Sequence, residues 1–384
     1  MKNIFSFTGA KKIVFGSGSF AVLAQHLGEL KAQRPLVVLD KNLAETSFRE
    51  KVSQVLQQGG VGFDLFDKVE PEPRLELADE GAKIALKKKC DAVIGIGGGS
   101  AMDVAKAVSV LAANKGKAVD YLGLNKVPGP GLPTIMVPTT AGTGSEVTFT
   151  AVFIRKNLKK KEGMNSPYLY PDLALLDPQL TLSLPPGPTA TTGLDALCHA
   201  IESYTSINAS PMSEIMSLEA IRLISENLRT CVHEGGNLEA REQMLLGSLY
   251  AGLGLANAGV TAVHSLSYPL GGKYGIPHGL ANTIMLLPVM AFNLPAALEK
   301  FTIIAEVMGE MTEDLPLREA ACLALDAVED LIEDCGIDDK LSDFNITEKD
   351  FPELAKVAMT VARPLENNPR KVTLEKAIEI YGEA

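Results

Sequence analysis

Hydrophobic and polar positions follow different patterns in the two halves of the chain. In the first half, short runs rich in Val, Ile and Leu alternate with segments of helical period. The predicted strands are residues 35–39, 62–66, 91–96 and 133–138, and the predicted helices are residues 45–59, 74–89 and 102–113. Strands that alternate with helices favour a parallel, Rossmann-like sheet that is covered on both faces.

The pattern changes at the proline-rich stretch of residues 184–188. After it there is almost no β-branched run, and segments such as 212–228 and 239–255 have helical period. A chain of 384 residues is also long enough for two domains. We therefore predict an α/β domain over residues 1–183 and an all-helical domain over residues 184–384.

Composition and charge narrow the class of protein. Hydrophobic residues make up 46% of the chain, which excludes global disorder, and the net charge of −11 argues against nucleic acid or an anionic membrane as a partner. The apolar run around residues 283–292 contains Pro288 and falls short of a membrane span. The five cysteines are widely spaced without a CxxC motif, so we expect neither a disulfide framework nor a cysteine zinc site, and a cytoplasmic location.

Two loops of the first half have the composition of a phosphate site. Gly97-Gly98-Gly99-Ser100 lies between a predicted strand and a predicted helix, where free backbone N–H groups attract anions. Residues 138–146 follow another strand and are dense in Thr and Gly. Asp40 ends an earlier strand, where a carboxylate can accept from ribose hydroxyls and repel a 2′-phosphate. These features indicate a dinucleotide site that prefers NAD to NADP, although a tight turn and a helix cap explain the same residues.

A second set of residues has the composition of a metal site. Asp195 and His199 are four residues apart in a helical stretch, so their side chains share a face. His264 lies in a small-residue-rich helix that we predict over residues 251–267, and His278 precedes another helix. One carboxylate and three imidazoles suit Fe(II) or Zn(II), whereas an Asp–His pair alone is often a simple helix-face contact. We interpret the remaining histidines, His26 and His233, as surface residues.

At this point the chain resembles the iron-dependent (group III) alcohol dehydrogenases. The resemblance runs in order over essentially the whole chain. Its motifs are Gly97-Gly98-Gly99-Ser100 with Asp103 and Lys106, Pro138–Thr148, Gly193-Leu194-Asp195-Ala196-Leu197 with His199-Ala200-Ile201-Glu202, His264–Gly272, Pro277–Asn282 and Asn368-Pro369-Arg370.

The resemblance implies a dehydroquinate synthase-like architecture, with an N-terminal nucleotide-binding domain and a C-terminal helical domain that binds the metal. It implies that Asp195, His199, His264 and His278 bind the metal and that Asp40 selects NAD. It further implies that the cofactor is lined by Gly97, Gly98, Gly99, Ser100, Asp103, Thr139, Thr140, Thr143, Ser145, Thr148, Lys161 and Leu180.

Two positions depart from the family pattern. Many members carry a further histidine near the substrate where this chain has Tyr268, and some have asparagine where it has Glu72. We take His278 and Tyr268 as the candidate catalytic residues. The resemblance also implies a homodimer or a higher homo-oligomer.

The sequence therefore predicts an NAD-dependent, iron-containing dehydrogenase. It would transfer a hydride reversibly between a primary or secondary alcohol, or its aldehyde or ketone, and NAD(H), with Fe(II), or alternatively Zn(II), activating the alcohol oxygen. A polyol dehydrogenase and a dehydroquinate synthase-like lyase remain alternatives on the same fold. A non-enzymatic scaffold would leave both loops of small residues unexplained.

Overall fold

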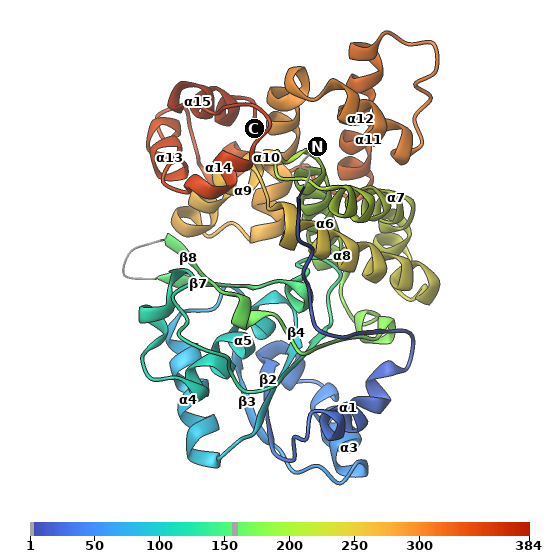
Figure 1. Cartoon of the computed structure of the whole chain (residues 1–384). Coiled ribbons are helices and arrows are strands. Elements are labelled where there is room, and N and C mark those ends of the chain that lie inside the picture. The colour runs from blue at the N-terminus through green and yellow to red at the C-terminus, as the bar shows by residue number, and fades with distance from the viewer. Residues whose placement is uncertain (1–3, 156–159) are drawn as a thin grey trace. The chain divides into compact units, whose positions relative to one another are not determined.

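Contacts between residues divide the chain into two compact units (Figure 1). The computed structural model describes residues 4–155 and 160–384. One unit is Gly9–Ser183, and the other is Leu184–Ala384 together with the described residues up to Thr8. The backbone of Thr8 joins the second unit through Asn257, since Thr8 N donates to Asn257 Oδ1 at 2.7 Å and Asn257 Nδ2 donates to Thr8 O at 2.9 Å.

The Gly9–Ser183 unit is built on a parallel sheet with the strand order β1-β9-β6-β4-β2-β3. Its strands are β1 (Ile13–Phe15), β2 (Pro35–Asp40), β3 (Asp64–Val69), β4 (Ala92–Gly97), β6 (Thr134–Pro138) and β9 (Leu173–Leu176). This confirms the predicted parallel sheet. The short strands β1 and β9 were not among the predicted elements.

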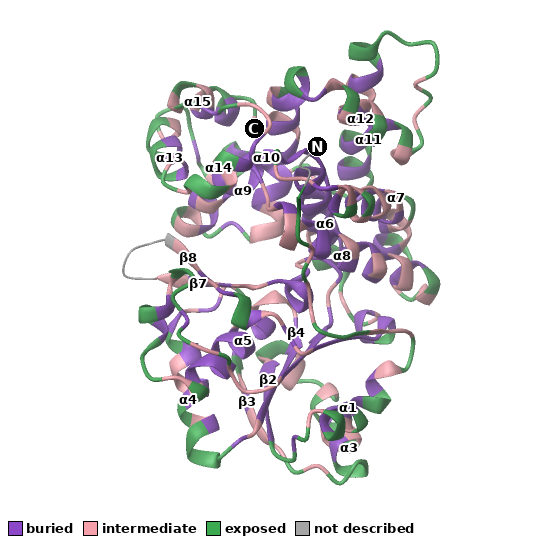
Figure 2. Cartoon of the chain, viewed as in Figure 1, coloured by how far each residue is buried: buried purple, intermediate pink, exposed green. Residues whose placement is uncertain are grey.

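Helices cover both faces of this sheet because successive side chains of each strand point to opposite sides. Leu36 and Val38 of β2 belong to the same core as α4 (Glu76–Lys88) and α5 (Gly99–Ala113). Val37 and Leu39 pack instead with α1 (Leu23–Glu29) and α3 (Phe48–Gln58). The central strands are buried throughout, as Figure 2 shows.

A second, smaller sheet with the order β5-β8-β7 was not predicted. It consists of β5 (Gly123–Leu124), β7 (Thr150–Arg155) and β8 (Lys160–Asn165), with β7 and β8 antiparallel. The unit also contains α2 (Lys41–Ala44) and the 3₁₀ turns η1 (Ser19–Val22), η2 (Ala118–Tyr121), η3 (Ser145–Val147), η5 (Pro167–Leu169) and η6 (Pro178–Thr181).

The unit that begins at Leu184 is mostly helical, as predicted. Its helices are α6 (Pro186–Thr205), α7 (Pro211–His233), α8 (Leu238–Ala258), α9 (Ala262–Pro269), α10 (His278–Asn293), α11 (Leu298–Met308), α12 (Leu317–Asp334), α13 (Phe351–Ala358), α14 (Ala362–Asn367) and α15 (Leu374–Gly382). Short turns are η7 (Leu270–Tyr274, a π-helix), η8 (Leu294–Ala296) and η9 (Leu341–Phe344). Helix α6 packs against α7, α8 and α10 and is almost wholly buried (Figure 2).

The single helix predicted over residues 251–267 is wrong. Helix α8 ends at Ala258, and α9 begins at Ala262 after a bend of 97° between the two segments. Gly259 lies at the break with φ +75°, a conformation that glycine adopts without a Cβ penalty.

Helix α10 is longer than the apolar run that the sequence indicated, because Pro288 lies inside it without ending it. Together with η8 it forms a 19-residue helical segment, His278–Ala296, with the length and apolar composition of a membrane span. Over half of this segment (56%) is buried within the protein, where α10 packs against α6, α9 and α12. We therefore interpret α10 as a core helix.

Candidate metal and dinucleotide sites

Helix α6 supplies two of the predicted metal ligands from one face. Asp195 and His199 lie one turn apart, with His199 Nε2 3.9 Å from Asp195 Oδ1. Both residues are buried, with 3% and 4% of their surfaces exposed. An ionisable pair so far from solvent needs further polar partners.

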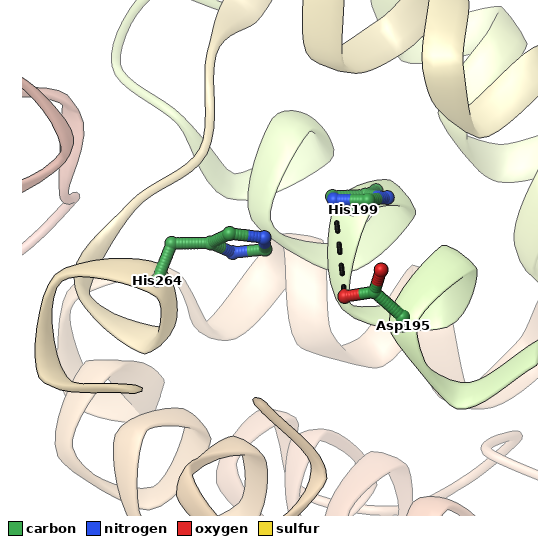
Figure 3. A group of neighbouring side chains, drawn as sticks. All are labelled: Asp195, His199 and His264. Carbon is green, nitrogen blue, oxygen red and sulfur yellow. Dashed lines mark ion pairs between the residues drawn. The ribbon is translucent and has the colours of Figure 1, made fainter. Parts of the chain in front are cut away.

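His264 of α9 and His278 at the start of α10 come to the same place. One ligand atom from each of Asp195, His199 and His264 lies within 4.8 Å of the other two, which makes this the metal-capable group found in the described part of the chain (Figure 3). The rings of His199 and His264 stack with centroids 4.9 Å apart. The ring of His278 lies 5.2 Å from that of His264. The structure thus gathers all four predicted ligands.

A glycine allows α10 to approach α6 this closely. A Cβ atom added to Gly279 would lie 2.3 Å from the carbonyl oxygen of Thr191 and 3.5 Å from Cβ of Asp195. No side chain fits into that space without moving backbone. Gly279 therefore allows the neighbouring His278 to lie beside Asp195.

The side chain of Asn282, one turn after His278, lies among the four ligands. Its Nδ2 atom donates to Asp195 Oδ1 at 2.7 Å and lies 3.1 Å from His264 Nε2 and 3.3 Å from His278 Nε2. Its Oδ1 atom is buried without a hydrogen-bond partner among the described residues. Sequence analysis assigned Asn282 no role, although its position four residues after His278 on one helix was a usable signal.

The charge state of Asp195 suits a cation. Burial acts to raise the pKa of this carboxyl, but the imidazoles of His199, His278 and His264 and the hydrogen bond from Asn282 outweigh burial, so its pKa lies below its ordinary value. The carboxylate therefore stays ionised near neutral pH.

Tyr268, the candidate that stands in place of a family histidine, is half-buried beside this group. Its ring centroid lies 6.0 Å from that of His278 and 6.5 Å from that of His264. The π-helix η7 begins two residues later, an irregularity that is frequent at functional sites.

In the Gly9–Ser183 unit, the glycine loop has the backbone geometry of a ligand cradle. Gly97 has φ +144°, and a Cβ atom there would lie 2.9 Å from Ala101 Cβ and 3.0 Å from Asp40 Cβ. A Cβ atom on Gly99 would lie 2.8 Å from Thr143. The loop leads through Gly98 and Ser100 into the first turn of α5, and so brings free N–H groups next to Asp40 and the threonine loop.

The threonine loop is held by a buried network around Asp103. Its Oδ1 atom accepts from Ser145 Oγ at 2.5 Å, and its Oδ2 atom accepts from Val152 N at 2.8 Å. Lys106 Nζ lies 3.2 Å from Asp103 Oδ1 and donates to Ser145 O at 3.0 Å, and it lies 3.4 Å from Thr148 Oγ1. Asp103, Ser145 and Thr148 thus bind one another in this structure. Lys106 was part of the family motif but had no predicted role.

Two polar groups of this loop lack partners among the described residues. Thr140 Oγ1 is buried and makes no hydrogen bond, whereas the neighbouring Thr139 is tied to the sheet through Thr139 N, which donates to Gly97 O at 3.0 Å. Glu146 Oε1 is likewise buried and unpartnered, and burial raises the pKa of Glu146 to about 7. An unpaired buried hydroxyl beside a glycine turn is the kind of group that a bound ligand satisfies.

Asp40 has both of the features that the sequence left open. It is the last residue of β2, and its Oδ1 atom accepts from Asn42 N at 2.9 Å as the N-cap of α2. Burial raises its pKa. Oδ1 serves as the cap, and the carboxylate as a whole lies beside Gly97.

The last two predicted cofactor residues are in different surroundings. The Lys161 side chain is 3% exposed, and its Nζ atom lies 2.6 Å from a carboxylate oxygen of Glu72, the residue that departs from the family pattern. Glu72 adopts φ +56° in its turn. Leu180 in η6 is buried in the core with Phe20 and Val137.

The two histidines outside the metal group differ in exposure. His233 is exposed, as predicted, and its Nε2 atom lies 2.8 Å from Asp334 O. The prediction for His26 is wrong: it is 6% exposed, and its Nδ1 atom lies 3.1 Å from Glu29 Oε2 one turn later.

Comparisons with known proteins agree along the chain. The sequence model described as "Iron-containing alcohol dehydrogenase" matches residues 10–178, and the model "Fe-containing alcohol dehydrogenase family, C-terminal" matches residues 189–384. The long-chain-alcohol dehydrogenase 1 of Geobacillus thermodenitrificans is 40% identical over 357 residues, which cover 92% of this chain and 90% of that protein.

Solved structures agree as well. A structure of 1,3-propanediol oxidoreductase matches with a TM-score of 0.96 and 36% identity over 99% of this chain and 100% of the other. The sulfoacetaldehyde reductase of Bifidobacterium kashiwanohense, solved in complex with NAD+, matches with a TM-score of 0.90 and 30% identity over 100% and 99% of the two chains.

Proposed function

The chain belongs to the iron-containing alcohol dehydrogenase family, and from that premise we propose that it transfers a hydride reversibly between an alcohol and NAD, using a divalent metal ion. The observation that carries the proposal is the gathering of Asp195, His199, His264 and His278 in a chain that has five histidines in all. Membership of this family favours a dehydrogenase over the lyase alternative.

The residues around Asp195 fit a divalent cation. The amide nitrogen of Asn282 carries two hydrogens, yet Asp195 Oδ1, His264 Nε2 and His278 Nε2 all lie within reach of it. One amide therefore cannot serve all three acceptors at once. A divalent ion accepts lone pairs from all of them and from His199, and three nitrogens with one carboxylate oxygen suit Fe(II), with Zn(II) as the alternative. When bound, such an ion acts as a Lewis acid on the alcohol oxygen.

The residues around Asp40 and the glycine loop fit NAD. The N-terminus of α5 offers N–H groups to the diphosphate, and Thr140 Oγ1 is a buried hydroxyl in need of a partner. We assign the ribose hydroxyls to Asp40, whose carboxylate would repel the extra phosphate of NADP. The NAD+ complex of the sulfoacetaldehyde reductase supports this cofactor.

The chain's own residues would orient the substrate and remove its hydroxyl proton. We assign proton transfer to the hydroxyl of Tyr268 because that ring lies beside His278 and is half-buried. His278 has a second role in this assignment, since its imidazole would hold the metal at the side of the cluster nearest to Tyr268.

Primary and secondary alcohols, or their aldehydes and ketones, are the substrate class that we propose. The matched relatives are named for long-chain alcohols, 1,3-propanediol and sulfoacetaldehyde, so members of the family share the reacting group but not the rest of the substrate. We further propose a cytoplasmic enzyme, in keeping with five free cysteines, that works as a homodimer or a higher homo-oligomer.

An alcohol panel tests the function directly. The full-length protein is stripped of metal, reconstituted anaerobically with Fe(II) or Zn(II), and assayed with NAD+ by the appearance of NADH absorbance. We expect turnover of at least one alcohol class with metal, a loss of activity in the stripped protein, and a loss of most activity in His199→Ala. Equal activity with and without metal would overturn the proposal.

A further inference from the structure

Glu202 is a buried carboxylate that none of the proposed roles uses. It lies on α6 one turn beyond His199 and is 2% exposed. Its Oε1 atom accepts from Thr261 N at 2.8 Å, from Thr261 Oγ1 at 2.9 Å and from His264 N at 3.4 Å. Its Oε2 atom makes a short hydrogen bond with Nδ1 of His264. All of its partners therefore belong to α9 or to the residue that precedes it.

These contacts determine how the ring of His264 is presented. An ionised carboxylate can only accept hydrogen bonds, so the hydrogen of a neutral His264 ring lies on Nδ1. The lone pair is then on Nε2. That atom faces the ligand group, 3.1 Å from the amide nitrogen of Asn282. Glu202 thus selects the tautomer that can bind a metal through Nε2.

The same carboxylate anchors the beginning of α9. Thr261 is the N-cap residue, but its side chain makes no capping hydrogen bond to the helix. Glu202 accepts the N–H groups of Thr261 and His264 instead, at the helix end that attracts negative charge. This anchor follows the break at Gly259, where the chain would otherwise be free to turn differently.

We propose that Glu202 is a positioning residue of the metal site, which holds the backbone and the ring of His264 so that Nε2 points at the ion. The proposal rests on the proposed metal site. Carboxylates behind metal-bound histidines contribute about 10–100-fold to metal affinity in other proteins. We expect a loss of that size when Glu202 is replaced.

Glu202→Gln is the sharpest substitution because it keeps the shape of the side chain. Its amide group would turn one N–H donor toward partners that are themselves donors, from either Thr261 or His264. Two control variants remove buried polar groups elsewhere. Asp177→Asn changes a buried carboxylate that accepts from Gly18 N and Phe20 N at 3.0 Å, and Ser203→Ala removes the hydroxyl that bonds to Ser217 at 2.7 Å.

The measurement is metal affinity, obtained by titrating the metal-free, full-length proteins with Zn(II) or Co(II) against a chelator of known affinity. The d–d spectrum of bound Co(II) reports the ligand geometry, and thermal unfolding of the metal-free proteins reports any general loss of stability. We expect the dissociation constant to rise about 10–100-fold in Glu202→Gln, with an altered Co(II) spectrum, and to change little in both controls.

Equal affinities and identical Co(II) spectra in the wild type and Glu202→Gln would overturn the role of Glu202 alone. A wild type that binds no metal would overturn the metal site itself and this proposal with it.

A second measurement needs no Glu202 variant and so remains decisive if Glu202→Gln does not fold. Nitrogen NMR of histidine-labelled, metal-free protein distinguishes the two neutral tautomers, with the His264 signals assigned by their absence in His264→Gln. The proposal predicts the tautomer with hydrogen on Nδ1. A ring with hydrogen on Nε2 would contradict it.

Discussion

Replacing Asp40 by glycine should change the preference of the enzyme between NAD and NADP. Asp40 ends β2 beside Gly97, at the loop that we assign to the cofactor. Its own fold role is modest, since Oδ1 caps the four-residue helix α2 through Asn42 N. Glycine at an N-cap costs only a few tenths of a kcal/mol relative to aspartate, so Asp40→Gly should fold normally.

The electrostatic term is larger than this capping term. A 2′-phosphate carries between about one and two negative charges, and unit charges about 4 Å apart at an effective dielectric constant near 20 repel by roughly 4 kcal/mol. Nearby cations are already engaged, since Lys41 and Arg49 lie 3.4 Å from Glu70 and Asp67. If relaxation leaves only a third of the repulsion, about 1.4 kcal/mol remains, which is a factor of about ten in affinity.

The assay compares kcat/KM for NAD+ and NADP+ in the wild type and in Asp40→Gly. We expect the wild type to prefer NAD+, and the variant to lose some activity with NAD+ and gain at least about tenfold with NADP+. Glu70→Gln is the matched control, because it removes a nearby negative charge that is largely exposed. A wild type that favours NADP+, or an equal change in both variants, would refute the reasoning.

Other substitutions test the remaining assignments. Because burial raises the pKa of Glu146 from 4.5 to about 7, its ionisation costs the folded state stability as pH rises through that interval, so Glu146→Gln should stabilise the protein by up to about 3 kcal/mol at pH 8 and by little at about pH 5; a pH-independent difference in thermal unfolding would refute this. Asn282→Asp places a carboxylate against Asp195, so we expect a lower unfolding temperature without metal and a larger gain on adding Zn(II); an unchanged metal-free protein would count against the contact. Gly279→Ala forces a Cβ atom onto Thr191 O, so chemical denaturation should show a loss of about 1–3 kcal/mol and chelator competition a weaker metal site, unless α10 shifts freely.

The parallel sheet was predictable because strands buried on both faces are continuous apolar runs, as in β2 and β4. The strands that escaped prediction lack that signal. β1 and β9 have only three and four residues, and β8 has the charged sequence Lys160–Asn165. These strands depend on pairing partners that are far away in sequence, so no local pattern identifies them.

The candidate metal site was partly visible in local spacing. Asp195 and His199 lie one turn apart on α6, but the approach of α9 and α10 is a tertiary event, and the break at Gly259 that allows it was read as continuous helix. The exposure of His26 was misjudged for a similar reason, since its partner Glu29 lies one turn later and pays the cost of burying a ring nitrogen.

The supporting residues were the hardest to assign. Glu202 and Asn282 share helix faces with ligands through three- and four-residue spacings, yet such spacings are common without any functional meaning. Only the hydrogen bonds to His264 and Asp195 give them roles.

The central claim is that one divalent ion binds to Asp195, His199, His264 and His278. Crystals of the full-length protein, reconstituted anaerobically with Fe(II) or Zn(II), test it by anomalous diffraction at the absorption edge of the metal. The account predicts one anomalous peak per chain, about 2.0–2.3 Å from a ligand atom of each of the four side chains. A peak elsewhere, or none at these residues with the ion in excess, would contradict it.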